Sequence, residues 1–177
     1  MDDPIISTAT VADVSELNQL VNSAYRGDSS RQGWTTEADL LSGLRTTEAD
    51  LYESLANPQA QILTYRAAGR LLGCVYLERK EAELYMGMLT VSPDHQTGGI
   101  GKRLLVAAEE MAKGFGCQMI TMTVISQRHE LIAWYERRGY RSTGVTKPFP
   151  DDPRFGVPAQ PLTFVVMAKS MGEGQPR

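Results

Sequence analysis

Hydrophobic and polar residues alternate along several short segments of this chain, which is the pattern of half-buried β-strands. The clearest case is QAQILTYRAAGRLLGCVYLER at 59–79, where two apolar runs flank a turn at Ala68-Gly69 and predict a β-hairpin. The run AELYMGMLTVSP at 82–93 predicts a third strand of the same sheet, closed by Pro93. Shorter strands are expected at 5–10, 118–126, 140–146 and 162–170.

A period of three to four residues marks the helices. The apolar positions that follow residue 13 share one helical face, namely Val14, Leu17, Val21 and Ala24. Asp13 and Glu16 are spaced as the N-cap of that helix and its partner three residues on. Two further amphipathic segments, 101–116 and 127–139, predict helices that end at glycines.

The hexapeptide TTEADL occurs twice, at 35–40 and again eleven residues later at 46–51. This spacing is too short for a solenoid repeat, and nothing else in the chain recurs. In each copy a threonine precedes an acidic residue by three positions, as at a helix N-terminus. The two copies therefore predict two short helices, beginning near Thr36 and Thr47.

Strands and helices are thus expected in the order β-α-α-β-β-β-α-β-α-β-β, with a long proline-rich loop at 147–161. Strands that alternate with helices after the hairpin predict at least one parallel crossover in a mixed sheet. A chain of 177 residues fits one domain. We expect a single domain over 1–170 and a frayed tail over 171–177.

Composition narrows the classes of function. The net charge is −3 with no basic stripe, so a nucleic-acid partner is not expected. No apolar run approaches the roughly 18 residues of a membrane span, and the N-terminus lacks the pattern of a signal peptide, which together predict a cytoplasmic protein without membrane association. Cys74 and Cys117 have neither CxxC spacing nor nearby histidines, so no metal site is expected.

A glycine-rich turn between the third hairpin strand and the next helix is the strongest chemical signal. Its glycines are Gly98, Gly99 and Gly101. A Walker A loop would need glycine at Gln96 and Ser or Thr at Arg103, and a dinucleotide turn would need glycine at Leu104. Neither pattern fits. Backbone N–H groups at a helix start nevertheless favour a phosphate, and glycines allow its close approach.

The turn instead reads V-x-P followed by Q-x-x-G-x-G over 91–101, which resembles the pyrophosphate-binding motif of the GNAT superfamily of acyl-CoA-dependent N-acyltransferases. ELIAWYERRGY at 130–140 resembles the penultimate helix of that superfamily, with a tyrosine four residues before a glycine and an aromatic. The element order resembles the superfamily over nearly the whole chain. The resemblance implies the α/β (α+β) GNAT-like fold, a central mixed twisted sheet of about seven strands flanked by about four helices.

The resemblance implies acetyl-CoA as cosubstrate. The expected pyrophosphate contacts come from the turn and the first residues of its helix: Gln96, Thr97, Gly98, Gly99, Gly101 and Lys102. The strand edge at Leu89 and Val91 is expected to pair with the pantetheine arm and to offer backbone N–H groups to the acetyl oxygen. Families of this group often carry Asn seven residues before the helix tyrosine. This chain has Arg128 there, and Ser126 and Arg128 are the candidates to replace the Asn.

Amine attack on a thioester needs a proton acceptor beside the amine and a proton donor beside the leaving sulfur. By resemblance the donor is Tyr135, whose alternative role is a core residue of an amphipathic helix. Glu83 is the candidate base, and the alternative is a solvated residue at a strand end. Glu83 and Tyr85 share strand parity with Leu89 and Val91, a relation that a bulge at Gly87 would break.

Two segments are expected to line the acceptor side, 25–36 and 147–158. With Tyr85, they offer the candidate substrate-binding residues Tyr25, Arg31, Trp34 and Phe149. Aromatic residues with charges of both signs suit a small amine-bearing or zwitterionic metabolite, although ordinary solvated loops remain the alternative. The sequence therefore predicts an N-acetyltransferase that acts on a small primary amine by direct attack in a ternary complex. A non-catalytic acyl-CoA sensor and a protein or peptide N-acetyltransferase are the rival functions, and a homodimer is plausible for the superfamily.

Overall fold

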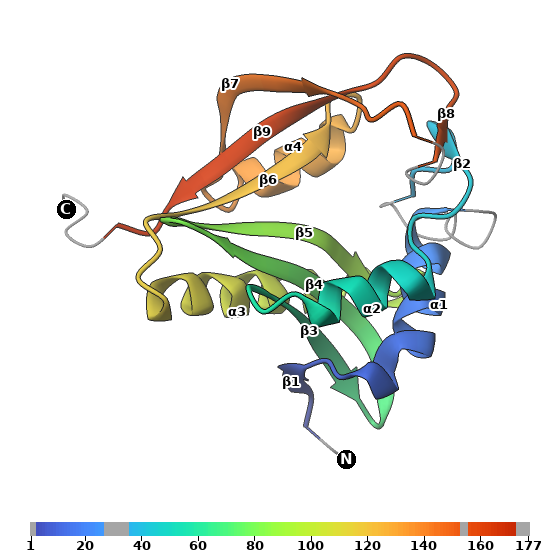
Figure 1. Cartoon of the computed structure of the whole chain (residues 1–177), viewed down its shortest axis with the longest axis vertical. Coiled ribbons are helices and arrows are strands. Elements are labelled where there is room, and N and C mark those ends of the chain that lie inside the picture. The colour runs from blue at the N-terminus through green and yellow to red at the C-terminus, as the bar shows by residue number, and fades with distance from the viewer. Residues whose placement is uncertain (1–2, 27–35, 153–155, 173–177) are drawn as a thin grey trace.

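The computed structural model describes residues 3–26, 36–152 and 156–172 (Figure 1). Its elements are β1 (Ile5–Thr8), α1 (Val14–Tyr25), β2 (Leu41–Ser42), α2 (Glu48–Ala56), β3 (Ala60–Ala67), β4 (Arg70–Lys80), β5 (Glu83–Val91), α3 (Ile100–Gly114), β6 (Met119–Ile125), α4 (His129–Glu136), β7 (Arg141–Pro148), β8 (Val157–Pro158) and β9 (Thr163–Ser170). The predicted hairpin, the third strand and the helix after the glycine turn are all present. The mixed α/β fold is confirmed.

Seven strands form one sheet in the order β1-β3-β4-β5-β6-β9-β7. Every neighbouring pair is antiparallel except β5 and β6, which run parallel and are joined by α3. The parallel pairing covers only Glu83–Tyr85 against Met119–Thr121, after which the two strands diverge (Figure 1). This divergence separates the second half of β5 from β6 and creates the place where the candidate site lies.

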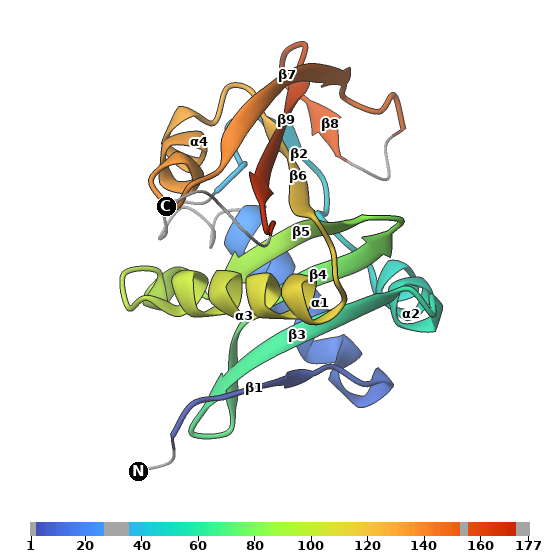
Figure 2. The ribbon, with the colours of Figure 1, turned by 90° about the vertical axis from the view of Figure 1, so that its left-hand side faces the viewer.

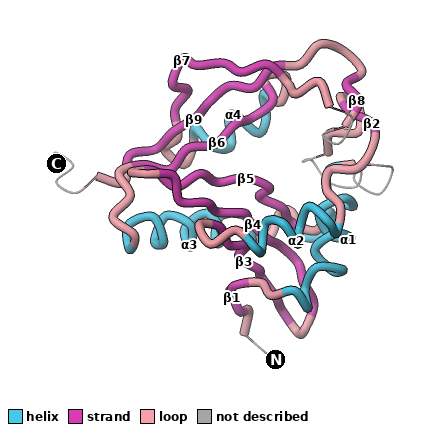
Figure 3. The backbone as a smooth tube through the Cα atoms, viewed as in Figure 1, coloured by secondary structure: helices cyan, strands magenta, loops and turns pink. Residues whose placement is uncertain are grey.

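Helices cover both faces of the sheet. Figure 2 shows α3 in front of β3, β4 and β5, with α1 behind them, and Figure 3 shows the same layering from the side. One core cluster joins α3 and α4 to the sheet through residues such as Leu104 and Tyr135, and another joins α1 and α2 to the opposite face through residues such as Leu17 and Leu51. None of the helices in the described ranges is long and apolar enough to cross a membrane.

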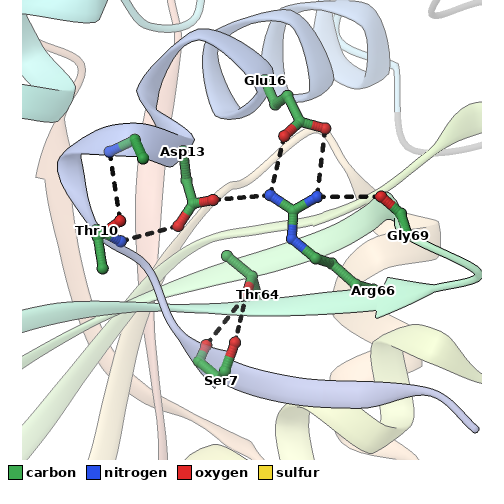
Figure 4. Close-up of polar contacts among 8 residues, drawn as sticks. Ser7, Thr10, Asp13, Glu16, Thr64, Arg66 and Gly69 are labelled. Atoms are coloured by element: carbon green, nitrogen blue, oxygen red, sulfur yellow. Dashed lines mark hydrogen bonds and ion pairs between the residues drawn. The ribbon is translucent and has the colours of Figure 1, made fainter.

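A 3-10 turn leads into α1 (Figure 4), and α1 itself begins at Val14, directly after the predicted N-cap position at Asp13. Thr10 caps a 3-10 turn over Val11–Asp13, with its hydroxyl accepting from the amide of Ala12 at 3.3 Å, while Asp13 accepts from the amide of Thr10 at 2.8 Å. Asp13 makes no side-chain cap to α1. Asp13 and Glu16 instead bind the guanidinium of Arg66 on β3 at 2.7 and 2.9 Å. Asp13 occupies the predicted N-cap position, but the predicted side-chain cap is absent because its carboxylate binds the amide of Thr10 and the guanidinium of Arg66.

The two copies of the hexapeptide take different structures. Thr47 caps α2 as predicted, accepting from the amide of Asp50 at 3.1 Å. The helix expected near Thr36 is absent: residues 38–40 form a turn, and the chain continues into β2, which pairs with β8. Leu41 is only 2% exposed and packs with Ile125 and Leu162, so tertiary packing holds this segment extended. β8 lies inside the predicted 147–161 loop, and β7 runs on to Pro148.

Candidate active site

The glycine turn joins β5 to the N-terminus of α3. Gly99 occupies the N-cap position with φ +83°, a left-handed conformation that favours glycine, and no side chain caps the helix. The side-chain amide of Gln96 donates to the carbonyl of Val91 at 3.0 Å and ties the turn to the end of β5. The first amides of α3 therefore have no side-chain partner at the cap, and the positive end of a 15-residue helix faces the turn. This arrangement favours a bound anion.

A cavity of about 250 Å³ lies beside this turn, and we call it the cofactor cavity. Eight predicted residues line it: Leu89, Val91, Gln96, Thr97, Gly99, Gly101, Lys102 and Tyr135. Gly98 belongs to the turn but is not among the lining residues.

The sequence interpretation missed three lining residues of α4 and its end, Leu131, Trp134 and Arg138. Together with Tyr135 they have the three-to-four-residue spacing of one helical face, and this was the signal that could have found them. The guanidinium of Arg138 lies 3.8 Å from the centroid of the Trp134 ring. Its Nε is buried without a hydrogen-bond partner among the described residues. Lys102 and Arg138 add positive charge to the helix terminus, which suits a pyrophosphate.

Tyr135 is 5% exposed and sits between two aromatic neighbours. Its ring packs edge-on against Trp134 and Tyr140, with centroids 5.1 and 5.8 Å apart. Burial raises the pKa of the Tyr135 phenol, and the charge of Tyr25 adds to the effect, while Arg128 opposes it. The phenol therefore stays protonated throughout the neutral pH range and is available as a proton donor.

A second and larger cavity, of about 750 Å³, lies on the other side of Tyr135, and we call it the acceptor cavity. It is bounded by α1, α2, the second half of β5 and residues of β6, and it includes the predicted Tyr25, Tyr85 and Phe149. Leu89, Leu131 and Tyr135 line both cavities. The two cavities therefore meet at the Leu89 edge of β5 and at the Tyr135 phenol. These are the groups that the sequence analysis placed beside the thioester.

A bulge in β5 shapes this junction. The register with β4 shifts between Cys74 and Tyr76, so that β5 carries one extra residue between Gly87 and Thr90, and Met88 there takes φ +55°. The hydroxyl of Thr90 donates to the carbonyl of Met88 at 2.9 Å, and the hydroxyl of Tyr25 donates to the carbonyl of Leu89. Side chains therefore hold the two peptide groups that flank the Leu89 Cα, one of which carries the Leu89 N–H.

The bulge also places Tyr85 on a different face of the sheet from Leu89 and Val91, although strand alternation had predicted one shared face. Leu89 and Val91 pack in the cluster below α3, whereas Tyr85 packs edge-on against Tyr76 on the α2 side. Glu83 occupies the first position of β5, opposite Lys80 and Met119 at the closed end of the sheet, and it lines neither cavity. The structure therefore does not bring Glu83 together with the rest of the candidate site.

The two candidates for the Asn position also lie outside the cofactor cavity. The hydroxyl of Ser126 lies 2.6 Å from that of Thr163, and Ser126 lines neither cavity. Arg128 lines the acceptor cavity instead. Arg31 and Trp34 fall in 27–35, outside the described residues.

A buried ion-pair network, which the sequence interpretation did not foresee, crosses the acceptor cavity. Glu37 accepts from Arg26 at 2.9 Å and from Arg128 at 3.3 Å, and all three side chains are between 5% and 8% exposed. Arg26 and Glu37 belong to the N-terminal half, and Arg128 precedes α4. Since the partners lie far apart in sequence, no local pattern could have revealed this network.

Comparison with known proteins settles the family. Residues 18–140 match the acetyltransferase (GNAT) family, and this match covers more than half of the chain. The chain belongs to the GNAT family of acetyltransferases. It is therefore an acyltransferase, and acetyl-CoA is its expected cosubstrate.

Individual relatives agree with this assignment. An IAA acetyltransferase of Azospirillum brasilense is 26% identical over 103 residues, which cover 57% of this chain and 67% of that one. A putative acetyltransferase from Salmonella typhimurium, solved with its cofactor acetyl-CoA, superposes with a TM-score of 0.71 at 19% identity over 99% of this chain and 98% of that one. The ribosomal-protein-S18-alanine N-acetyltransferase of Escherichia coli gives a TM-score of 0.71 at 15% identity, covering 99% and 100% of the two chains. At these identities the solved structures show that the fold is shared.

Proposed function

We propose that this enzyme transfers the acetyl group of acetyl-CoA to the primary amine of a small molecule, by direct attack when both substrates are bound. The observation that carries the proposal is the junction of the two cavities at Leu89 and Tyr135. The amine can reach one side of a thioester placed there while the CoA moiety occupies the other.

The residues at the junction suit the chemistry of this step. The amine nitrogen forms a bond to the acetyl carbon, and the bond from that carbon to sulfur breaks. We assign the backbone N–H of Leu89 to the developing charge on the acetyl oxygen, because the bond made by Thr90 holds the peptide group of that N–H and the bond made by Tyr25 holds the next one. Tyr135 donates its proton to the departing thiolate, and the proton that the nitrogen loses as the amide forms returns through water to the phenol.

The acceptor amine must arrive without its extra proton. A free amine like that of lysine, with a pKa of about 10.4, is mostly protonated at neutral pH. Arg26 and Arg128 line the acceptor cavity, and positive charge beside a bound ammonium lowers its pKa. The proton can then leave to water before attack, without a carboxylate base at Glu83.

A small acceptor is favoured over a protein because the acceptor cavity has a volume within the range of small-molecule sites and buried charged groups on its wall. The relative named an IAA acetyltransferase points in the same direction.

The test supplies acetyl-CoA with a panel of free amines, or with lysine-rich and alanine-terminated peptides, at equal amine concentration, and follows the release of CoA thiol. We expect release with a subset of the free amines. Release with peptides alone would assign a protein acceptor. Thermal stabilisation by CoA without any turnover would assign a non-catalytic acyl-CoA sensor.

A further inference from the structure

Arg45 is a charged residue of the acceptor cavity to which the catalytic scheme gives no role. It lines the cavity and is half-buried. Among the described residues its guanidinium has no carboxylate partner, whereas Arg26 and Arg128 share Glu37. The guanidinium lies over the ring of Tyr25, whose centroid is 5.6 Å from the Arg45 Cζ.

The backbone of Arg45 is held firmly against α1. The side-chain oxygen of Asn22 accepts from the amides of Arg45 and Thr46 at 2.7 and 3.1 Å, and its nitrogen donates to the carbonyl of Thr46 at 3.0 Å. Three hydrogen bonds from one side chain therefore fix the point from which the guanidinium extends. A binding group on a fixed backbone loses less entropy when it binds its ligand.

Tyr25 links Arg45 to the reacting centre. The hydroxyl of Tyr25 donates to the carbonyl of Leu89 at the junction of the two cavities, while Arg45 lies over its ring. The guanidinium is therefore about one tyrosine ring away from the edge assigned to the acetyl group. A group bound by Arg45 would be only a few bonds from a nitrogen that attacks at Leu89.

Three guanidiniums, those of Arg26, Arg45 and Arg128, gather around Tyr25. Arg26 and Arg128 share the carboxylate of Glu37, whereas Arg45 pairs with no carboxylate among the described residues, although Asp50 and Glu53 also line the cavity. Burial lowers the pKa of Arg26, and the charges of Arg45 and Arg128 lower it further, while Glu37 opposes this. An anionic ligand would relieve this repulsion, and a guanidinium binds a carboxylate through two parallel hydrogen bonds.

We propose that Arg45 binds an acid group of the acceptor, so that the substrate is an amine with a carboxylate or a similar acid a few bonds from its reacting nitrogen. This inference rests on the proposed acetylation of a small amine and specifies which amines are accepted. The acid gives Arg45 a charged partner, and the amine points from there toward the thioester.

The experiment compares α-amino acids, aminoalkyl phosphonates and the carboxamides of the same amino acids as acceptors. A carboxamide holds more neutral amine at a given pH, because the lost carboxylate no longer stabilises the ammonium. A site without an acid-binding group would therefore prefer the carboxamides. We expect the wild-type enzyme to prefer one acid class, and the class preferred identifies the acid.

Arg45→Gln tests the residue itself. We expect KM for the acid acceptor to rise by about 10- to 100-fold, the usual worth of hydrogen bonds to a charged group, while turnover of the carboxamide and KM for acetyl-CoA are unchanged. Arg45→Lys keeps the charge and should recover part of the loss. Arg70→Gln, on the exposed turn of the β3–β4 hairpin, is the control and should leave all constants as in the wild type.

Each result has a clear meaning. Equal use of acids and carboxamides by the wild type, or an equal loss of both in Arg45→Gln, would overturn the acid-binding role while leaving the acetyltransferase in place. An equal loss of both acceptor classes in Arg45→Gln is what a purely structural role of Arg45 would produce. Failure to release CoA thiol with any amine would contradict the proposed function and the acid-binding role together.

Discussion

Gly99 and Gly116 lie at opposite ends of α3 and share one local geometry. Both have φ in the left-handed region, +83° and +75°, and at both an added Cβ would meet no atom within 4 Å. They differ in one respect, since Gly99 lines the cofactor cavity and Gly116 follows the other end of the helix. Gly99→Ala and Gly116→Ala therefore impose the same backbone strain, and only the first adds atoms beside the proposed pyrophosphate.

The size of each effect can be worked out. Alanine in the left-handed region costs about 1–2 kcal/mol. For a chain of this length about 1 kcal/mol corresponds to roughly 2–4 °C in Tm, so both variants should unfold about 2–8 °C below the wild type. CoA at about 100 times its Kd stabilises a folded protein by about 2.7 kcal/mol, which is roughly 5–11 °C.

We expect Gly116→Ala to keep the full shift with CoA and Gly99→Ala to lose most of it. The reason is that the new methyl group occupies the space through which a phosphate approaches the backbone amides of the turn.

The assay is thermal unfolding of the three proteins with and without CoA, supported by calorimetric titration of CoA. The strain is matched, so a lower starting Tm cannot by itself explain a missing shift. An equal shift with CoA in both variants would refute the assignment of the pyrophosphate to this turn.

Three further predictions follow from buried groups. Tyr135→Phe should lower kcat roughly 100- to 10,000-fold with Tm and KM for acetyl-CoA unchanged, and a wild-type rate in the thiol-release assay would mean that another group protonates the thiolate. Glu37→Gln leaves the buried guanidiniums of Arg26 and Arg128 without their carboxylate, so it should cost about 3–5 kcal/mol and roughly 6–20 °C in thermal unfolding; a loss below about 2 °C would show that water already solvates both. Burial raises the pKa of Cys74 from 9.0 to about 12, so its contribution to stability is complete below pH 9 and is lost as the pH rises toward 12. The urea midpoint should fall between pH 8 and 10.5, and an equal fall in Cys74→Ala would assign the loss to other groups.

Features that depend on neighbouring residues were predictable from the sequence. The alternation of apolar residues placed the β3–β4 hairpin and β5, and the helical period placed α1 and α3. The glycine turn was recognisable because glycine is the residue that most readily takes the left-handed backbone conformation found at this helix start. The tyrosine of α4 was found through its spacing to Gly139, which is also local.

The acceptor side was not predictable in this way. Glu37, Arg45 and Arg128 come from three separate segments, and they come together in one cavity only once the chain has folded. The bulge that turned Glu83 and Leu89 to different faces depends on how β5 pairs with β4. β4 and β5 are neighbours in the chain, and the sequence raised a bulge near Gly87 only as an alternative, because the position of an extra residue in one strand depends on how both strands pack in the folded sheet.

The repeated hexapeptide separates the two kinds of information within one chain. Both copies carry the threonine and the acidic residue of a helix start, and the second copy forms α2 as its local preference dictates. The first leads into β2, because Leu41 is buried against Ile125 and Leu162 and its strand pairs with β8. A helix cap contributes about 1 kcal/mol, whereas burying a leucine contributes about 1.5–3 kcal/mol. Local sequence therefore determined the structure where tertiary packing agreed with it, and burial decided the structure where the two conflicted.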